Sequence, residues 1–306
     1  MRSGLKKGLW LAVLTALFSG VANYANKFTL TAVGDPLVHT TLKNALVGLL
    51  IVSFLVISKK LPKLRQLSKR EISLLVVIAI VGGSIPFYLF FGGLAQTSAI
   101  NASLIHKTLV FWVALIAIPL LKEKVSSWQW GALGLIFSAN LLVGGFKSFR
   151  FSQAELMILG ATWLWAIENV IVKKVLRRVD PDIVVGARMG LGSVVLLAWV
   201  VIEGKAQLMT QLTLFQYGLI GFTSLLLLGY VATWYRALKL VPVTQVATVL
   251  TVATLVTNGL TAVEKQAFPF QQVAVMVLVV AGVWFFSLWA VEGRVGKGVR
   301  APFATE

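Results

Sequence analysis

The sequence predicts an all-α polytopic membrane protein with ten transmembrane helices, arranged as two inverted five-helix repeats. The first observation is composition: 58% of the 306 residues are apolar, only 13% are charged, and the mean hydropathy is +0.87. Soluble proteins carry roughly 25% charged residues. The second observation is that long apolar runs recur along the whole chain, and about 20 apolar residues cross a hydrocarbon layer of ~30 Å. Ten such runs use almost all of the chain, which excludes a separate soluble catalytic domain.

The expected helices are apolar runs bounded by charged residues, Gly or Pro. Short connections between them make successive helices antiparallel neighbours. A β-barrel is excluded because the runs are about twice the length that a membrane strand needs and lack its alternating pattern. In chain order the runs cover 8–32, 37–57, 72–93, 98–121, 127–145, 153–173, 183–202, 213–235, 242–263 and 271–291.

The first run also fits a second interpretation. It follows Lys6 and Lys7, as the apolar region of a cleaved signal peptide would. However, the run continues past Asn23 to Leu30 without a clean small-residue cleavage site. We therefore expect a retained membrane span.

The composition also excludes several kinds of site. The absence of Cys rules out disulfides, thiolate nucleophiles, zinc ribbons and iron–sulfur ligation, and two histidines are too few for a histidine metal cluster. We expect no metal or cofactor. The net charge of +17 is not a nucleic-acid signature, because the basic residues lie in short loops between apolar runs rather than on one folded face. The lipid bilayer is the expected partner of these loops.

The distribution of Lys and Arg predicts the orientation, since cytoplasmic loops carry the excess of basic residues. With the N-terminus inside, 20 of the 28 basic residues fall on the cytoplasmic side, and the loop from Lys59 to Arg70 is the most basic. Only Lys147, Arg150, Lys205 and Lys265 fall on the opposite side. We expect a multi-pass protein of the cytoplasmic (inner) membrane with both termini in the cytoplasm.

Two similar turns indicate an internal repeat. The first helix is followed by Asp35-Pro36 and the sixth by Asp180-Pro181, and superposing these turns places Lys43 on Arg188. We therefore expect two units, residues 1–146 with helices one to five and residues 147–306 with helices six to ten and a short cytoplasmic tail. Because five is odd, the second unit enters the membrane from the opposite face. Inverted repeats around a site at the membrane midplane are a common plan of secondary transporters.

Several segments are similar to a known family. The clearest begins at Trp234 and reads Trp-Tyr-Arg-Ala-Leu-Lys-Leu-Val-Pro-Val-Thr, and the last span contains Ala281-Gly-Val. The first half has Leu121-Lys-Glu-Lys-Val-Ser and Trp130-Gly-Ala-Leu-Gly. With these segments the chain resembles the EamA-like branch of the drug/metabolite transporter superfamily. The resemblance implies a ten-helix transporter that works by alternating access, with the last helix of each unit packed away from the cavity. Members handle amino acids, nucleotide sugars, sugar phosphates and cationic drugs, so the substrate stays open.

Charged side chains inside the spans are the candidate functional residues, because burying a charge in the bilayer is expensive. Lys107 lies deepest, and the repeat pairs Lys43 with Arg188. We expect these three cations to bind the substrate. The alternatives are a structural ion pair between Lys107 and Glu168, and, for the other two, side chains that reach the membrane interface.

Glu168 is the only acid well inside a predicted span and is the candidate for proton coupling. Trp163 and Tyr235 are the aromatic candidates for substrate contact, since aromatic rings bind cations and stack on other rings. The excess of cations over acids favours a substrate with a carboxylate or phosphate.

These residues predict a secondary active transporter for a small anionic or zwitterionic metabolite (amino acid, sugar phosphate or nucleotide type). Protons or a counter-substrate would supply the energy, because the chain has no nucleotide-binding motif. Two alternatives stay open: a flippase for an anionic lipid or lipid-linked sugar, and a multidrug or cationic metabolite exporter that uses Glu168. An enzyme is not expected, because the spans hold one acid and no Gly-x-Ser-x-Gly motif.

Overall fold

The computed structural model describes residues 2–97, 102, 105–144, 152–264, 266 and 270–292, and these residues form helices and no strands. The elements are α1 (Arg2–Val33), α2 (Pro36–Ile57), η1 (Leu61–Gln66), α3 (Lys69–Val81), α4 (Ile85–Leu94), α6 (Leu109–Leu121), α7 (Ser127–Gly144), α8 (Gln153–Val175), α9 (Pro181–Gly186), η2 (Ala187–Leu191), α10 (Gly192–Ile202), α11 (Ala206–Thr210), α12 (Leu214–Leu240), α13 (Val243–Leu250), α14 (Ala253–Glu264) and α15 (Phe270–Glu292).

Helix lies in every one of the predicted ranges, so the all-helical class is confirmed. Seven stretches are long and apolar enough to cross a membrane, and residues 105–121 and 276–287 form shorter apolar helices. The number of crossings and the inverted arrangement stay predictions. The predicted tail after residue 292 and the predicted boundary between the two units, at residues 146 and 147, lie outside the described residues.

Both Asp-Pro turns start a helix in the same way. The Asp35 carboxylate accepts hydrogen bonds from the backbone N–H groups of Leu37 and Val38, both at 2.9 Å. The Asp180 carboxylate accepts one from the N–H of Asp182 at 3.0 Å. In each case Pro occupies the start of the helix, where its missing N–H would have no partner. The turns that indicated the repeat are therefore one structural motif used twice.

Three of the predicted spans have an interruption within the described residues that lies next to a cavity. The first interruption is at Gly82–Ser84, between α3 and α4, and Pro86 lies in the first turn of the new helix. The second is at Thr251–Val252, between α13 and α14, where the Thr251 hydroxyl donates to the Thr248 carbonyl at 2.7 Å. The third is the π-helical turn η2 between α9 and α10. Discontinuous helices near the midplane are typical of transporter binding sites, and these three lie next to the cavities described below.

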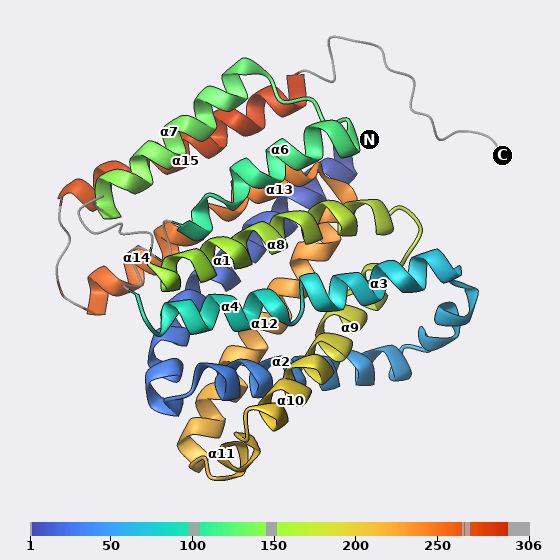
Figure 1. The fold of residues 1–306 in the computed structure, drawn as a ribbon. Helices are drawn as coiled ribbons and strands as arrows, with labels where there is room; N and C mark the ends of the chain where they lie inside the picture. The colour runs from blue at the N-terminus through green and yellow to red at the C-terminus, as the bar shows by residue number, and fades with distance from the viewer. Residues whose placement is uncertain are drawn as a thin grey trace.

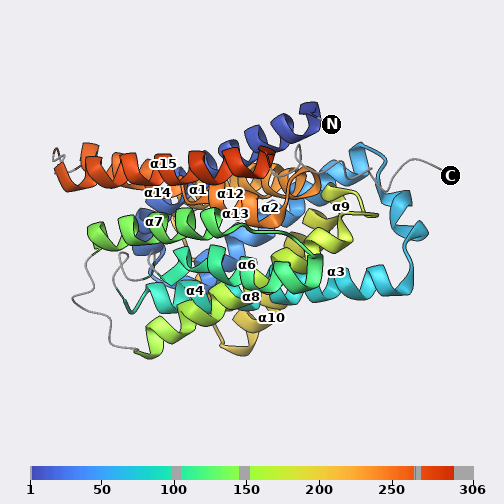
Figure 2. The same ribbon diagram turned by 90° about the horizontal axis from the view of Figure 1, so that it is seen from above.

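α3, α4 and α8 run roughly alongside one another, and α1 and α12 cross them at a steeper angle (Figure 1; Figure 2 gives the view from above). α1 packs against α12 along much of its length, and α4 packs against α8. α7 and α15 lie side by side at one edge of the bundle (Figure 1). Neither of these edge helices contributes a described residue to the two polar cavities of the bundle.

Candidate functional site

The bundle encloses a polar cavity of about 110 Å³ between α1, α2, α4, α6, α8, η2 and α12. It is large enough for several water molecules, since one water needs about 10–15 Å³ of such space. Its charged lining residues are Lys43, Glu168 and Arg188. Uncharged polar and aromatic side chains complete the wall, among them Asn23, Asn26, Phe87, Phe90, Phe91, Trp165, Asn169, Tyr230 and Trp234. We call this space the central cavity.

Lys43 is held in the central cavity by neutral groups. Its side chain is on α2 and only 2% exposed. The ammonium group donates a hydrogen bond to Asn26 Oδ1 at 3.1 Å and lies 4.3 Å from the centre of the Phe91 ring. No carboxylate among the described residues lies within 4.0 Å of it. A ring face and one amide oxygen compensate the buried charge only partly, so Lys43 has capacity for an anionic ligand.

Arg188 and Glu168 face each other across the same cavity. Their side chains are 6% and 2% exposed, and Arg188 Nε lies 3.6 Å from Glu168 Oε1. The Nε group makes no hydrogen bond within the described residues, so the guanidinium retains free donors. Glu168 also accepts a hydrogen bond from the Tyr235 hydroxyl. The partner of Glu168 is therefore Arg188, and the alternative of a Lys107–Glu168 ion pair is wrong for the described residues.

A pair of glycines brings the α3–α4 interruption against these charges. A Cβ on Gly83 would overlap the backbone oxygen of Arg188, and one on Gly82 would lie 2.8 Å from the Glu168 carboxyl carbon. The free carbonyls of the interruption find side-chain donors: Trp165 Nε1 donates to Gly82 at 3.1 Å, and Asn44 Nδ2 to Gly83 at 3.3 Å. The interruption is thus held in one geometry under Arg188 and Glu168.

Lys107 lines a second, smaller cavity of about 50 Å³. This space, which we call the side cavity, lies at the interruption between α13 and α14 and is lined by Thr251 and Thr254. It shares Ser19, Asn23, His106 and Leu109 with the central cavity. Lys107 makes no hydrogen bond or ion pair with any residue that the structure describes. Lys107 therefore lines a different cavity from Lys43 and Arg188, and the two cavities adjoin each other.

The two predicted aromatic residues lie elsewhere. Trp163 is 47% exposed and packs against Trp112, with ring centroids 4.8 Å apart, so it lines neither cavity. The reason is the helical period: Trp165, two residues later, points about 200° away and faces the central cavity. Tyr235 is fully buried behind Glu168 and orients that carboxylate rather than lining the space. Its neighbour Trp234 does line the cavity and donates to Asn169 at 3.0 Å.

His39 is a buried polar residue that the sequence did not single out. It is fully buried one helical turn before Lys43, and its ring lies 5.3 Å from that of Phe91. Neither ring nitrogen has a partner among the described residues. The four-residue spacing between His39 and Lys43 puts both on one face of α2, and this spacing was the available signal.

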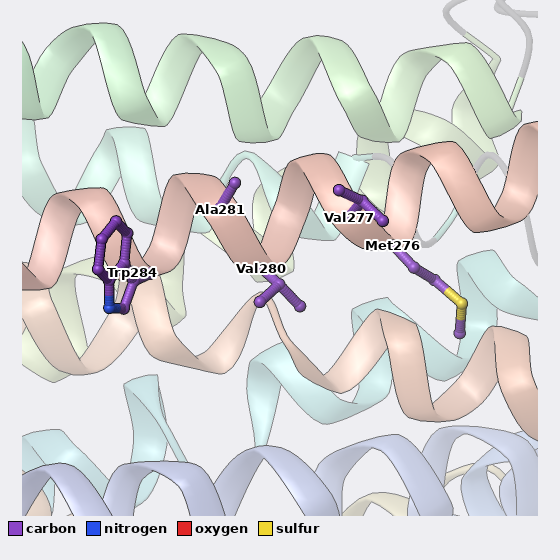
Figure 3. Close-up of a pocket in the computed structure, with 5 residues that line it drawn as sticks. All are labelled: Met276, Val277, Val280, Ala281 and Trp284. Carbon is purple, nitrogen blue, oxygen red and sulfur yellow. The ribbon is translucent and has the colours of Figure 1, made fainter.

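A separate, open hollow on the surface of α15 is apolar. It measures about 420 Å³ and is lined by Met276, Val277, Val280, Ala281 and Trp284 of α15 (Figure 3). Val277, Val280 and Trp284 are more than half exposed. With no polar lining group, this surface suits lipid chains and offers nothing that would bind a polar metabolite.

Two clusters of ion pairs join the ends of the α2 span to the α9–α10 span. In the Asp180 cluster, Lys63 lies 3.1 Å and Lys60 3.6 Å from Asp180, and Lys60 and Arg236 both pair with Asp182. Although its partial burial acts in the opposite direction, hydrogen bonds from the Asp182 N–H and Lys63 lower the pKa of Asp180. This cluster lies on the side predicted to be cytoplasmic.

In the Asp35 cluster, Lys205 lies 3.0 Å from Asp35 and 2.7 Å from Glu203. The hydrogen bond to Glu203 raises the pKa of Lys205, and the hydrogen bond from Lys205 lowers that of Glu203. The two clusters correspond to each other in sequence, because Asp35 and Asp180 are 145 residues apart and so are Lys60 and Lys205. Lys43 and Arg188 share this offset.

Between the clusters the two spans touch through small residues. A Cβ on Gly48 of α2 would lie 2.9 Å from the backbone oxygen of Met189 and 3.1 Å from Cα of Gly190. Gly186 meets Leu55 and Ile51 of α2 in the same way. The two glycines on the second span thus form a close-packing face, as small residues do between membrane helices.

Comparison with known proteins identifies the family. A sequence model of the EamA-like transporter family matches residues 6–145 and, separately, 152–288. A protein of Methanothermobacter thermautotrophicus, described as an uncharacterized transporter, is 26% identical over 145 residues, which is 45% of this chain and 42% of that protein. A solved crystal structure has a similar fold, with a TM-score of 0.73 over 92% of this chain and 98% of that chain at 14% identity.

Proposed function

The chain belongs to the EamA-like transporter family, and we propose that it is a secondary active transporter for a small anionic or zwitterionic metabolite of the amino acid, sugar phosphate or nucleotide type. The observation that carries this proposal is the charge of the central cavity. Two buried cations, Lys43 and Arg188, face one carboxylate, Glu168. An anionic group of the substrate would balance the remaining charge.

The two cations differ in how much of their charge is already compensated. Arg188 has a carboxylate at 3.6 Å, whereas Lys43 has one amide oxygen and a ring. A cation that stays buried without a counter-ion costs several kcal/mol. We therefore propose Lys43 as the primary contact for the acidic group, with Arg188 as a second donor. The aromatic wall formed by Phe87, Phe91 and Trp165 would pack against the carbon skeleton.

We further propose that transport proceeds by alternating access between two inverted five-helix units, residues 1–146 and 147–306. The two ion-pair clusters support this, because each joins an Asp-Pro helix start of one unit to the segment after the second helix of the other. The close contact at Gly48 would act as the pivot between them. Breaking the Asp35 cluster would open the cavity to one side of the membrane, and breaking the Asp180 cluster would open it to the other.

Glu168 is the proposed coupling group. Its carboxylate is shared between Arg188 and the hydroxyl of Tyr235. Protonation, or a substrate group that takes over Arg188, would release this arrangement and change the balance between the two cavity openings. Protons or a counter-substrate would then drive net transport. The basic loops place the Asp180 cluster and both termini on the cytoplasmic side of the inner membrane in this proposal.

The two alternative functions have less support. A flippase needs a polar surface open to the lipid for the headgroup, and the open hollow on α15 is entirely apolar. An exporter of cations needs a free carboxylate, and Glu168 is already bound by Arg188 and Tyr235.

The proposal is tested by ligand-induced stabilisation of the purified protein. A ligand present at 100 times its dissociation constant raises the free energy of unfolding by about 2.7 kcal/mol. Amino acids, sugar phosphates, nucleotides, lipids and cationic compounds form the panel. We expect stabilisation by an acidic compound, its loss in Lys43→Met, and its retention in Lys27→Met, because Lys27 is exposed and lines neither cavity. Stabilisation by cations alone would contradict the proposal.

A further inference from the structure

The side cavity is a second place where a buried lysine lacks a counter-ion. Lys107 has three N–H donors, and no described carboxylate lies within 4.0 Å of its ammonium nitrogen. The neighbouring Thr251 and Thr254 hydroxyls donate to helix carbonyls at 2.7 and 2.8 Å, and as uncharged groups they do not balance the charge of Lys107. The interruption between α13 and α14 leaves space at this point. The side cavity therefore has the features of an anion subsite.

The side cavity and the central cavity adjoin each other. Ser19, Asn23, His106 and Leu109 line both. Asn23 lines both spaces and therefore lies at the boundary between them. Polar residues lie on both sides of this boundary, so a single small ligand could extend across it and contact both cavities.

The charges of the two cavities do not balance. Their charged lining residues are the cations Lys43, Lys107 and Arg188 and the acid Glu168, which leaves a net charge of +2 among the described residues. A substrate with one acidic group leaves one buried lysine without a counter-ion, and a zwitterion leaves both charges uncompensated. A substrate with two acidic groups balances the site. Because the two lysines lie in different cavities, the two groups must be separated by a carbon skeleton.

We infer that the two cavities together bind one small metabolite with two separated acidic groups, a dicarboxylate or a phosphorylated carboxylic acid, with one group at Lys43 and the other at Lys107. The inference rests on the proposed function and narrows its substrate class. Arg188 and Glu168 then remain a pair, and the skeleton lies along the shared wall at Asn23 and His106.

The test compares ligand pairs that differ in one acidic group. The probes are succinate and succinamate, glutarate and glutaramate, glutamate and glutamine, and 3-phosphoglycerate and glycerol 3-phosphate. Thermal unfolding of the purified full-length protein, measured across a concentration series, gives an apparent Kd for each. We expect at least one diacid to bind at least tenfold more tightly than its partner.

The variants assign that preference to Lys107. In Lys107→Met the ratio of the two apparent Kd values should fall to about one, since both ligands of a pair would then bind through Lys43 alone. Lys107→Gln is used if the Met variant does not fold. The matched control Lys27→Met removes an exposed cation of α1 and should keep the preference.

The outcomes separate this inference from the proposed function. If mono-acids bind through Lys43 as tightly as diacids, or if both Lys107 variants keep the preference, the inference is wrong and the proposed function stands. If no anion of the panel stabilises the protein, both are wrong.

Discussion

Gly83→Ala tests the close approach that positions Arg188. The new Cβ would overlap the Arg188 carbonyl oxygen and would lie 3.0 Å from its carbonyl carbon and 2.8 Å from the backbone oxygen of Ala79. These neighbours are backbone atoms, so no side chain can rotate away, and the α3–α4 interruption must move away from η2. Overpacking of this kind costs about 1–3 kcal/mol. With a shift in the melting temperature of about 2–4 °C for each kcal/mol, we expect a fall of several degrees.

The displacement should also affect ligand binding, because Arg188 and Glu168 would separate. We expect Gly83→Ala to weaken binding of the stabilising anion, measured by thermal unfolding with and without ligand. The matched control is Gly221→Ala on α12, where a Cβ meets no atom within 4 Å and the melting temperature should stay constant or rise slightly. The reasoning is refuted if Gly83→Ala melts and binds like the parent protein, or if both glycine variants lose stability equally.

Four further variants have defined expectations. Glu168→Gln removes the carboxylate next to Arg188, so it should abolish the response of transport to a pH gradient in proteoliposomes while some binding remains; unchanged pH dependence would make Glu168 structural. Tyr235→Phe removes a hydrogen bond to a charged group, worth about 1.5–3 kcal/mol, and should destabilise the protein in thermal unfolding, whereas Trp163→Ala should leave ligand binding unchanged because Trp163 lines neither cavity. The hydrogen bond from Lys205 lowers the pKa of Glu203. The stability that ionised Glu203 contributes to the fold is therefore complete above its ordinary pKa and is lost as the pH falls through the lowered value. Below about pH 4.5, the ordinary value, the melting temperature should therefore fall more steeply in the parent protein than in Glu203→Gln.

The helices could be predicted from the sequence because their signals are local. Apolar runs of membrane length, Asp-Pro starts and basic loops each report on a few neighbouring residues. The geometry of the interruption at Gly82–Ser84 could not be predicted in this way, because it is held by partners that are distant in the sequence. Trp165 and Asn44, for example, bind the free carbonyls of Gly82 and Gly83.

The sequence predicted only part of the candidate site, because only some of its residues give a local signal. The rarity of charges in apolar runs singled out Lys43, Arg188 and Glu168, which the structure brings to one cavity. Choosing between Trp163 and Trp165 needs the rotation of α8 about its axis, and the available signal was Glu168, which lies three residues after Trp165 and therefore on the same face of the helix. The four-residue spacing places His39 on the same face of α2 as Lys43, but its contact with Phe91 of another helix is not visible in a local pattern.

Alternating access around the central cavity is tested most directly by labelling a cysteine at Asn23 from each side of the membrane. The chain has no Cys, so Asn23→Cys introduces the only thiol. Asp35→Asn and Asp180→Asn each keep a helix-capping side chain but remove the charge that pairs with Lys205 or with Lys63. We expect Asp35→Asn to speed labelling by an impermeant maleimide from the external side, and Asp180→Asn to speed it from the cytoplasmic side. Equal changes on both sides, or none, would contradict the account.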